Sequence, residues 1–276
     1  MTRRFTIRTV LATAVVALSA LLPDAAAAVT YPRVMAATGD SMTRAFNTGF
    51  LPFTDNPAAS WSTGTDGRVN SHYLRLRAVS PTGKLAAHND ARSGAKMADL
   101  NGQMTTAVSQ GADYITVLMG ANDVCTSSEG SMTSVQTFRT QFTTAMNTVT
   151  SQLPRARILV VSIPDIHHLW EVLHTNFLAR VTWNTFAVCQ SMLANPGSTV
   201  QADVDRRQRV KDRNVAFNNV LADVCAQYTQ CRFDGFAAFT TQFTSSDVST
   251  RDYFHPSISG EAKLASVTWQ VSFWAN

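Results

Sequence analysis

A serine, a histidine and an aspartate stand in two short segments near opposite ends of the sequence. Ser41 lies in the sequence GDSM, and Asp252 and His255 are the first and last residues of DYFH. A serine hydroxyl becomes a nucleophile when a histidine removes its proton and a carboxylate orients that histidine. These residue types therefore predict nucleophilic acyl transfer if the fold brings the two segments together. Each segment alone is equally typical of a helix cap or a surface loop.

Two further residues could stabilise a negatively charged oxygen. Asn122, in the sequence GAND, can donate a side-chain N–H to a developing oxyanion. Gly94, in the sequence SGA, can offer its backbone N–H at close range, because it has no side chain. We assign both residues, with the backbone N–H of Ser41, to a predicted oxyanion hole. For each residue taken alone, an ordinary turn is the alternative.

The elements that must position these residues alternate between strands and helices. Apolar runs predict strands over 33–38, 84–88, 114–119, 158–163 and 231–233. Helical spacing predicts helices over 67–79, 95–110, 134–153, 204–228 and 260–274, the last capped by Ser257 or Ser259. Such alternation predicts an α/β protein, with three α/β/α layers around a central parallel sheet. In such sheets the active site forms in the loops after the carboxyl ends of the strands.

The order Ser, Gly, Asn, His along the chain resembles the SGNH-hydrolase superfamily, also called the GDSL esterases and lipases. Its blocks correspond here to Ser41 in GDSM, Gly94, Asn122 in GAND and His255 in DYFH, and the resemblance covers roughly residues 35–264. Met42 stands where leucine is commonest, which is a conservative exchange between apolar residues. The resemblance implies an SGNH/flavodoxin-like fold and a serine ester hydrolase that needs no cofactor.

A finer resemblance is to the phospholipase B-like branch of that superfamily. It is carried by SWSTGTDG at 60–67, GANDVC at 120–125 and FHPS at 254–257. It implies acyl esters of lipids or phospholipids as substrates, with Trp61 either as a wall of the substrate site or as a packing residue. The alternatives are a carbohydrate O-acetyl esterase, an acyltransferase and a non-catalytic surface-binding protein of the same fold. Intact Ser41, Asp252 and His255 disfavour the last of these.

The N-terminal segment has the pattern of a secretory signal peptide. Three arginines among the first eight residues precede a mostly apolar run over 10–22, and AxA cleavage sites follow at 25–28. We therefore expect a signal peptide over 1–28, a single hydrolase domain over 29–276 and a secreted, extracellular protein. The arginine pair at positions 3 and 4 leaves twin-arginine export open beside general secretion.

The composition of the 276-residue chain is that of a globular protein. Apolar residues make up 45% and charged residues 15%, which excludes a disordered or coiled-coil chain. The net charge of +4 comes without a clustered basic stripe, so the sequence gives no indication of nucleic-acid binding. We expect a monomer that acts on a small ester or lipid substrate and makes transient contact with lipid surfaces.

Four cysteines would meet an oxidising environment after export, and they allow three pairings. Cys225 and Cys231 are close enough in sequence to close a small loop, which would leave Cys125 to pair with Cys189. The scattered spacing, without a CxxC sequence, disfavours a zinc site.

Three histidines near one glutamate raise the question of a metal site. His167, His168 and His174 surround Glu171 at helical spacing. The zinc motif with two histidines four residues apart and a glutamate between them is not matched. We therefore expect structural or surface histidines, with contact to substrate at the rim of the site as a minor alternative, and no metal.

Two long stretches outside the predicted core elements are expected to wall the substrate site. They are residues 43–66 and 165–203. The predicted helix that follows carries Asp203 four residues before Arg207, and Asp205 four residues before Arg209. This spacing predicts salt-paired side chains on a solvated helix face, with attraction to anionic lipid headgroups as the alternative.

Overall fold

The computed structural model describes residues 1–2 and 30–275, and the chain divides into the segment Met1–Thr30 and the compact unit Tyr31–Asn276. Most of the predicted signal peptide therefore lies outside the described residues. None of the helices in the described part of the chain has both the length and the apolar character needed to cross a bilayer.

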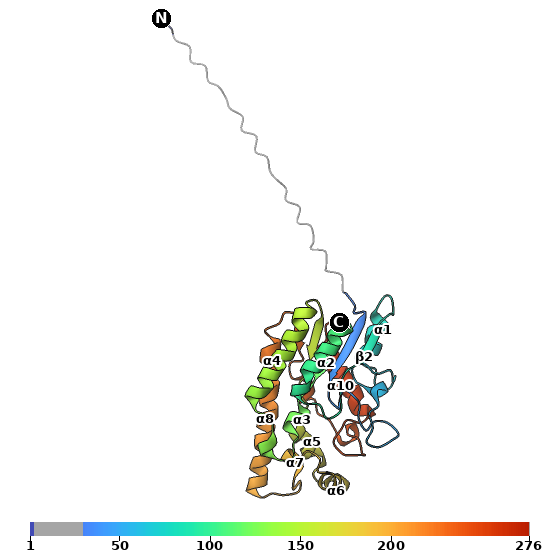
Figure 1. Cartoon of the computed structure of the whole chain (residues 1–276), viewed down its shortest axis with the longest axis vertical. Helices are drawn as coiled ribbons and strands as arrows, with labels where there is room; N and C mark the ends of the chain where they lie inside the picture. The colour runs from blue at the N-terminus through green and yellow to red at the C-terminus, as the bar shows by residue number, and fades with distance from the viewer. Residues whose placement is uncertain (3–29, 276) are drawn as a thin grey trace. The chain divides into compact units, whose positions relative to one another are not determined.

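A five-stranded sheet, in which every neighbouring pair is parallel, forms the centre of the compact unit (Figure 1). Its order is β2-β1-β3-β4-β5, so the strand order reverses between β1 and β3, where ligands bind in sheets of this kind. The strands are β1 Val34–Gly39, β2 Ala86–Asn89, β3 Tyr114–Leu118, β4 Arg157–Val160 and β5 Cys231–Phe233.

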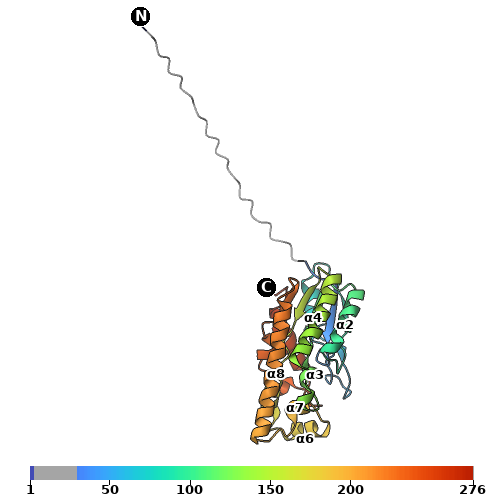
Figure 2. The ribbon, with the colours of Figure 1, turned by 60° about the vertical axis from the view of Figure 1, so that its left-hand side comes forward.

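Helices cover both faces of the sheet, which confirms the predicted three-layer α/β class, and α2, α4 and α8 lie side by side over one of these faces (Figure 2). Side chains alternate along β3: Ile115 and Val117 belong to the core beneath α2, α4 and α8, whereas Tyr114 and Leu118 belong to the core beneath α1 and α10. The helices are α1 His72–Val79, α2 Met97–Ser109, α3 Ala121–Val124, α4 Val135–Gln152, α5 Ile166–Leu173, α6 Phe177–Thr185, α7 Gln190–Leu193, α8 Gln201–Cys225, α9 Ala237–Thr240 and α10 Ile258–Gln270.

The predicted elements are present, but several ends differ from the prediction. The first helix begins at His72 rather than at residue 67, because the Ser71 side chain caps it by accepting from Leu74. The fourth strand ends at Val160 rather than at residue 163. The N–H of Ile163 donates to the Asn218 side chain of α8 and not to a neighbouring strand. The stretch 165–203, which lies outside the predicted core elements, contains the short helices α5, α6 and α7.

The salt pairs predicted at the start of α8 do not form for Arg207 and Arg209. Arg209 instead binds Glu129 through two hydrogen bonds of 2.6 and 2.9 Å. Arg207 is buried, with its guanidinium 4.3 Å from the ring centroid of Trp170. Both side chains are long enough to reach neighbouring elements, so spacing within one helix does not identify their partners.

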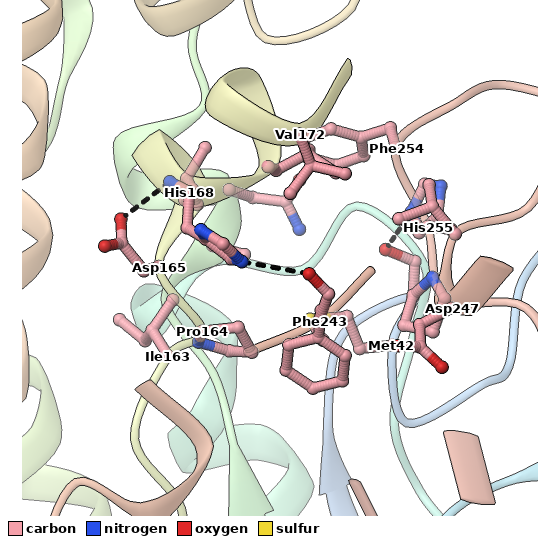
Figure 3. Close-up of a pocket in the computed structure, with 17 residues that line it drawn as sticks. Met42, Ile163, Pro164, Asp165, His168, Val172, Phe243, Asp247, Phe254 and His255 are labelled. Atoms are coloured by element: carbon pink, nitrogen blue, oxygen red, sulfur yellow. Dashed lines mark hydrogen bonds between the residues drawn. The ribbon is translucent and has the colours of Figure 1, made fainter. Parts of the chain in front are cut away.

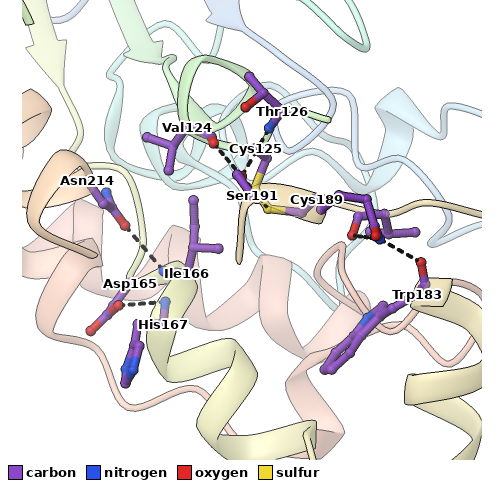
Figure 4. Close-up of a disulfide and its surroundings, with 12 residues drawn as sticks. Val124, Cys125, Thr126, Asp165, Ile166, His167, Trp183, Cys189, Ser191 and Asn214 are labelled. Carbon is purple, nitrogen blue, oxygen red and sulfur yellow. Dashed lines mark hydrogen bonds between the residues drawn. A yellow bond between two sulfur atoms is a disulfide. The ribbon is translucent and has the colours of Figure 1, made fainter. Parts of the chain in front are cut away.

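Both predicted disulfides are present. Cys125, just after α3, is bonded to Cys189 at the start of α7 (Figure 4). Cys225, the last residue of α8, is bonded to Cys231 at the start of β5. The first disulfide ties the loop after β3 to the segment between α6 and α8.

Candidate active site

Ser41, His255 and Asp252 come together in the structure although the serine and the histidine are 214 residues apart in sequence. The Nε2 atom of His255 lies 2.7 Å from the Oγ of Ser41, and its Nδ1 atom lies 2.6 Å from Oδ2 of Asp252. In this arrangement a histidine can take the serine proton while the carboxylate stabilises the imidazolium that forms.

The end of β1 holds Ser41 in place. Gly39 has φ +148° there, and a Cβ at this position would lie 2.4 Å from the carbonyl oxygen of Leu118. The Gln103 side chain of α2 accepts from the Gly39 N–H at 2.7 Å and donates to its carbonyl at 2.9 Å. Asp40, buried beside the serine, accepts the N–H of Met42. The turn that carries Ser41 is thus fixed on both sides.

A compact turn holds Asp252 and His255. The Oδ1 atom of Asp252 accepts the backbone N–H groups of Phe254 and His255, each at 3.0 Å. The carbonyl of His255 accepts from the N–H of Ser249 at 2.8 Å, and the neighbouring Val248 and Pro256 form an isolated antiparallel bridge. Asp252 therefore orients the histidine backbone with one oxygen and its ring with the other.

Asn47 completes this arrangement, and sequence reasoning missed it. Its Nδ2 donates to Oδ2 of Asp252 at 2.5 Å, and its Oδ1 accepts the N–H of Phe53 at 2.6 Å. The side chain of Ser249 donates to the Asn47 carbonyl. An asparagine six residues after Ser41 gives no sequence signal for a contact with a residue 205 positions away.

The ionisation of Asp252 suits the role of a histidine partner. Burial raises the pKa of Asp252, but hydrogen bonds from His255 and Asn47 outweigh that effect and hold it below its usual range. Asp252 is therefore a carboxylate at neutral pH. Asp40 behaves differently, since burial raises its pKa to about 6, and its Oδ2 has no hydrogen-bond partner among the residues that the structure describes.

The predicted oxyanion donors lie near one another. Asn122, on α3, lines the same pocket as Ser41. Its Nδ2 donates to the carbonyl of Ala95 at 3.0 Å. Ala95 directly follows Gly94, whose φ is +82°. No hydrogen bond within residues 30–275 uses the backbone N–H of Ser41 or Gly94. These groups are thus unengaged, and their role in an oxyanion hole stays a prediction.

The loop that carries Asn122 is anchored by its neighbour, Asp123. One oxygen of Asp123 accepts the N–H of Met97 at 2.8 Å, and the other accepts the hydroxyl of Thr133 at 2.7 Å. Burial raises the pKa of Asp123, and these hydrogen bonds partly offset the rise. Together with the Cys125–Cys189 disulfide, these contacts fix the loop on either side of Asn122.

An apolar cavity of ≈ 80 Å³ opens beside the serine and the histidine. Figure 3 shows Met42 and His255 across this pocket from Ile163 and His168. Helix α5 forms one wall, as expected for part of 165–203, and the segments at 243–248 and 254–256 form the other. The apolar lining residues are Met42, Ala121, Ile163, Pro164, Ile166, Leu169, Val172, Phe243, Val248, Phe254 and Pro256.

Contrary to the expectation for residues 43–66, none of them lines the cavity, although the ring of Phe46 lies 4.9 Å from that of His255. Trp61 in particular is a packing residue: it is fully buried, and its ring packs edge-on against His72 at 5.4 Å. Its indole N–H donates to Thr43, and its backbone N–H donates to the buried Glu261. A large ring with its polar atom satisfied in the core cannot contact substrate.

The two histidines of α5 share one acidic neighbour. His167 and His168 each place Nδ1 near the Glu171 carboxylate, at 3.2 and 3.3 Å. In the part of the chain that the structure describes, no three potential ligands converge on one point. His168 does line the cavity, where its Nε2 lies 2.9 Å from the carbonyl of Phe243.

A curated protein is similar in sequence to part of this chain. Over 215 residues, 65% of this chain, it is 27% identical to "Phospholipase B1, membrane-associated" from Rattus norvegicus. The match covers 15% of that protein, so this chain corresponds to a small part of it.

Solved structures of hydrolases share the fold. LAE5, an alpha/beta hydrolase enzyme from the metagenome of Lake Arreo, Spain, has a TM-score of 0.57 at 13% identity, covering 90% of this chain and 98% of that one. Phospholipase A1 from Streptomyces albidoflavus has a TM-score of 0.53 at 13% identity, covering 87% of this chain and all 100% of its own.

Family membership follows from a match that spans nearly the whole compact unit. Residues 35–267 match the model of GDSL-like lipases and acylhydrolases, a range that includes Ser41, Gly94, Asn122 and His255. The chain therefore belongs to the GDSL-like lipase/acylhydrolase family.

Proposed function

We propose that the protein is a secreted serine ester hydrolase that cleaves acyl esters of lipids or phospholipids through an acyl-enzyme on Ser41. The observation that carries the proposal is the chain of contacts from Ser41 through His255 to Asp252, of 2.7 and 2.6 Å, at one side of an apolar cavity. The signal-peptide pattern and the two disulfides support secretion.

The proposed reaction begins with proton transfer from Ser41 to Nε2 of His255. The serine Oγ then bonds to the ester carbonyl carbon, and the carbonyl electron pair moves onto the oxygen. As this tetrahedral species collapses, His255 returns the proton to the leaving alcohol and the acyl group stays on Ser41. Water, deprotonated by His255, repeats the sequence and releases a carboxylic acid. Asp252 stays ionised throughout and stabilises the imidazolium.

The oxyanion of each tetrahedral species accepts hydrogen bonds from the protein. We assign the donors to the backbone N–H groups of Ser41 and Gly94 and to the side chain of Asn122. Donors held in place before the reaction stabilise the transition state without reorganising. The anchors around Asn122 provide that rigidity.

The apolar lining of the cavity supports an acyl chain as the bound group. A chain of methylene groups would transfer from water to a surface formed by α5, Phe243 and Phe254, which is favourable in proportion to the apolar area buried. An acetyl group would bury much less. A carbohydrate O-acetyl esterase is therefore the second candidate, and the length of the preferred acyl chain separates the two.

The test is hydrolysis of p-nitrophenyl esters from acetyl to palmitoyl by the wild type, Ser41→Ala and the control Ser151→Ala on the outer face of α4. We expect Ser41→Ala to lose activity, the control to keep it, and the rate to be highest for an acyl chain longer than acetyl. Equal activity in Ser41→Ala would rule out the acyl-enzyme. Activity confined to the acetyl ester would favour the carbohydrate deacetylase.

A further inference from the structure

Large apolar side chains are exposed on two segments that meet beside the active site. Phe50 is 91% exposed on the loop after the serine turn, and Phe177 is 68% exposed on α6. The rings of Phe53 and Phe186 lie 5.5 Å apart, so the two segments form one continuous surface. We call this surface the apolar rim; it consists of Phe50, Leu51, Phe53, Phe177, Leu178 and Phe186.

Each half of the apolar rim is joined to the turn that carries Asp252. Asn47 accepts from the N–H of Phe53 and donates to Asp252. Trp183 of α6 is buried, and its indole N–H donates to the carbonyl of Tyr253 at 3.0 Å. Helix α6 begins at Phe177, four residues after the end of α5, the helix that walls the pocket (Figure 1). The rim therefore borders the catalytic residues.

The charges on the rim segments are positive. Residues 45–54 contain no charged residue, and residues 175–188 contain only Arg180. Arg251 lies against the loop, where its guanidinium donates to the carbonyl of Phe50 at 2.6 Å. The first carboxylate after the loop, Asp55, is already paired with Arg44 at 2.9 Å. Exposed aromatic and aliphatic side chains flanked by arginines are typical of surfaces that bind the interface of an anionic membrane.

We propose that the apolar rim docks the protein on an anionic phospholipid surface, with Phe50, Phe177 and Leu178 entering the boundary between headgroups and acyl chains. The two arginines complement the negative headgroups. A second copy of the chain fits less well, because a two-fold contact through the rim would bring Arg180 and Arg251 of both copies together with no free carboxylate on the rim segments to pair with them. The inference goes beyond the proposed function, because docking needs no catalysis.

The test measures binding to vesicles of phosphatidylcholine with phosphatidylserine, using sedimentation of protein with vesicles. All proteins carry Ser41→Ala, so that the vesicles stay intact. The rim variant adds Phe50→Ser, Phe177→Ser and Leu178→Ser. The matched control adds Val79→Ser, Val200→Ser and Val204→Ser, which are exposed apolar residues outside the rim. Residues 1–30 are the same in all three proteins, so any contribution of that segment to binding cancels.

We expect the rim variant to bind about 100-fold or more weakly than the parent, because three apolar side chains no longer leave water. The control should bind like the parent, and added salt or vesicles without phosphatidylserine should weaken binding. Equal binding by the rim variant and the control would overturn the proposal, as would no vesicle binding by any of the three. A change from dimer to monomer in the rim variant, without vesicle binding, would assign the rim to self-association instead.

The rim variant with Ser41 restored separates this proposal from the proposed function. Its hydrolysis of a water-soluble short-chain ester should match the wild type, because the three exchanged side chains lie outside the cavity. Vesicle binding without any ester hydrolysis in the wild type would uphold docking and refute the proposed function. Ester hydrolysis by the wild type without rim-dependent vesicle binding would uphold the proposed function and refute docking.

Discussion

At the scale of single residues, the predicted oxyanion donors allow an effect on kcat to be separated from an effect on KM. Asn122 is held beside the Gly94–Ala95 segment and lines the pocket with Ser41. A donor that acts only on the oxyanion stabilises the transition state and not the bound ester. Its removal should therefore appear in kcat.

Asn122→Ala is expected to lower kcat by about 10²–10³ with little change in KM. Steady-state kinetics on a p-nitrophenyl ester measure both constants, with Asn219→Ala, an exposed asparagine of α8 outside the pocket, as a control. A rise in KM as large as the fall in kcat would contradict an oxyanion role.

Asn47 is a positioning residue, since it acts on His255 through Asp252. Asn47→Asp keeps an oxygen for the N–H of Phe53 but replaces the donor to Asp252 by a second carboxylate. Two adjacent carboxylates cannot both ionise easily, so one pKa must rise. We expect the acidic limb of the kcat/KM profile to move to higher pH by about one unit or more.

A nearby asparagine provides the control for this shift. Asn56 donates to the hydroxyl of Thr48 and has no bond to Asp252, so Asn56→Asp should leave the acidic limb in place. Identical pH profiles for Asn47→Asp and the wild type would remove Asn47 from the catalytic arrangement.

At the scale of elements, the Cys125–Cys189 disulfide links the loop of Asn122 to α7. Its cysteines are 64 residues apart in sequence, whereas those of Cys225–Cys231 are 6 apart. In the chain-entropy model the loss of stability grows with the length of the closed loop. The two disulfides therefore offer a matched comparison of stability and activity.

Replacing Cys125 and Cys189 by alanine should lower the free energy of unfolding by about 4 kcal/mol and also lower kcat. Replacing Cys225 and Cys231 should cost about 2 kcal/mol and leave kcat unchanged, because β5 and the end of α8 do not line the pocket. Denaturant unfolding and ester kinetics measure both effects. An unchanged kcat in the first variant would show that the tether does not position Asn122.

The elements themselves were largely predictable from the sequence. Each strand is an apolar run or precedes a loop that carries candidate catalytic residues. The sequences GDSM and DYFH match the serine and histidine motifs of a known superfamily. Those local signals sufficed to predict the sheet and the meeting of Ser41 with His255, whose catalytic roles stay predictions. The disulfide pairing followed because one close pair of cysteines left a single remaining pair.

The contacts that were not predictable depend on three-dimensional neighbours. Asn47 donates a hydrogen bond to Asp252, which is 205 residues away in sequence, and Arg209 donates to Glu129, which is 80 residues away. Trp61 is equally compatible with a substrate wall and a core position until its surroundings are known. Spacing within one segment cannot show which distant segment packs against it, so these assignments required the fold.

At the scale of the whole molecule, a buried histidine links stability to pH. Burial lowers the pKa of His72 to about 3, and its ring atoms lie 2.8 and 2.9 Å from the hydroxyls of Tyr114 and Thr268. The folded protein keeps His72 neutral, whereas the unfolded chain binds a proton below about pH 6.5. The stability that depends on a neutral, buried His72 is therefore fully present above pH 6.5 and is lost as the pH falls toward 3.

We expect His72→Gln to flatten the fall in stability between about pH 6.5 and 3, where His72 accounts for up to about 1.4 kcal/mol per pH unit. Denaturant unfolding at several pH values measures how the free energy of unfolding changes with pH. A loss of stability that the substitution causes equally at every pH does not alter this slope. Parallel slopes in the variant and the wild type would show that His72 is protonated in the folded protein.

The arginines beside the apolar rim have a kinetic consequence if both proposals hold. Each turnover on a neutral phosphatidylcholine vesicle releases a fatty acid, whose carboxylate makes the surface more negative. Arg180 and Arg251 then bind that surface more strongly, so the product recruits further enzyme. Progress curves on neutral vesicles should accelerate after a lag, and fatty acid added at the start should abolish the lag. The enzyme would thus favour membranes that it has already begun to degrade.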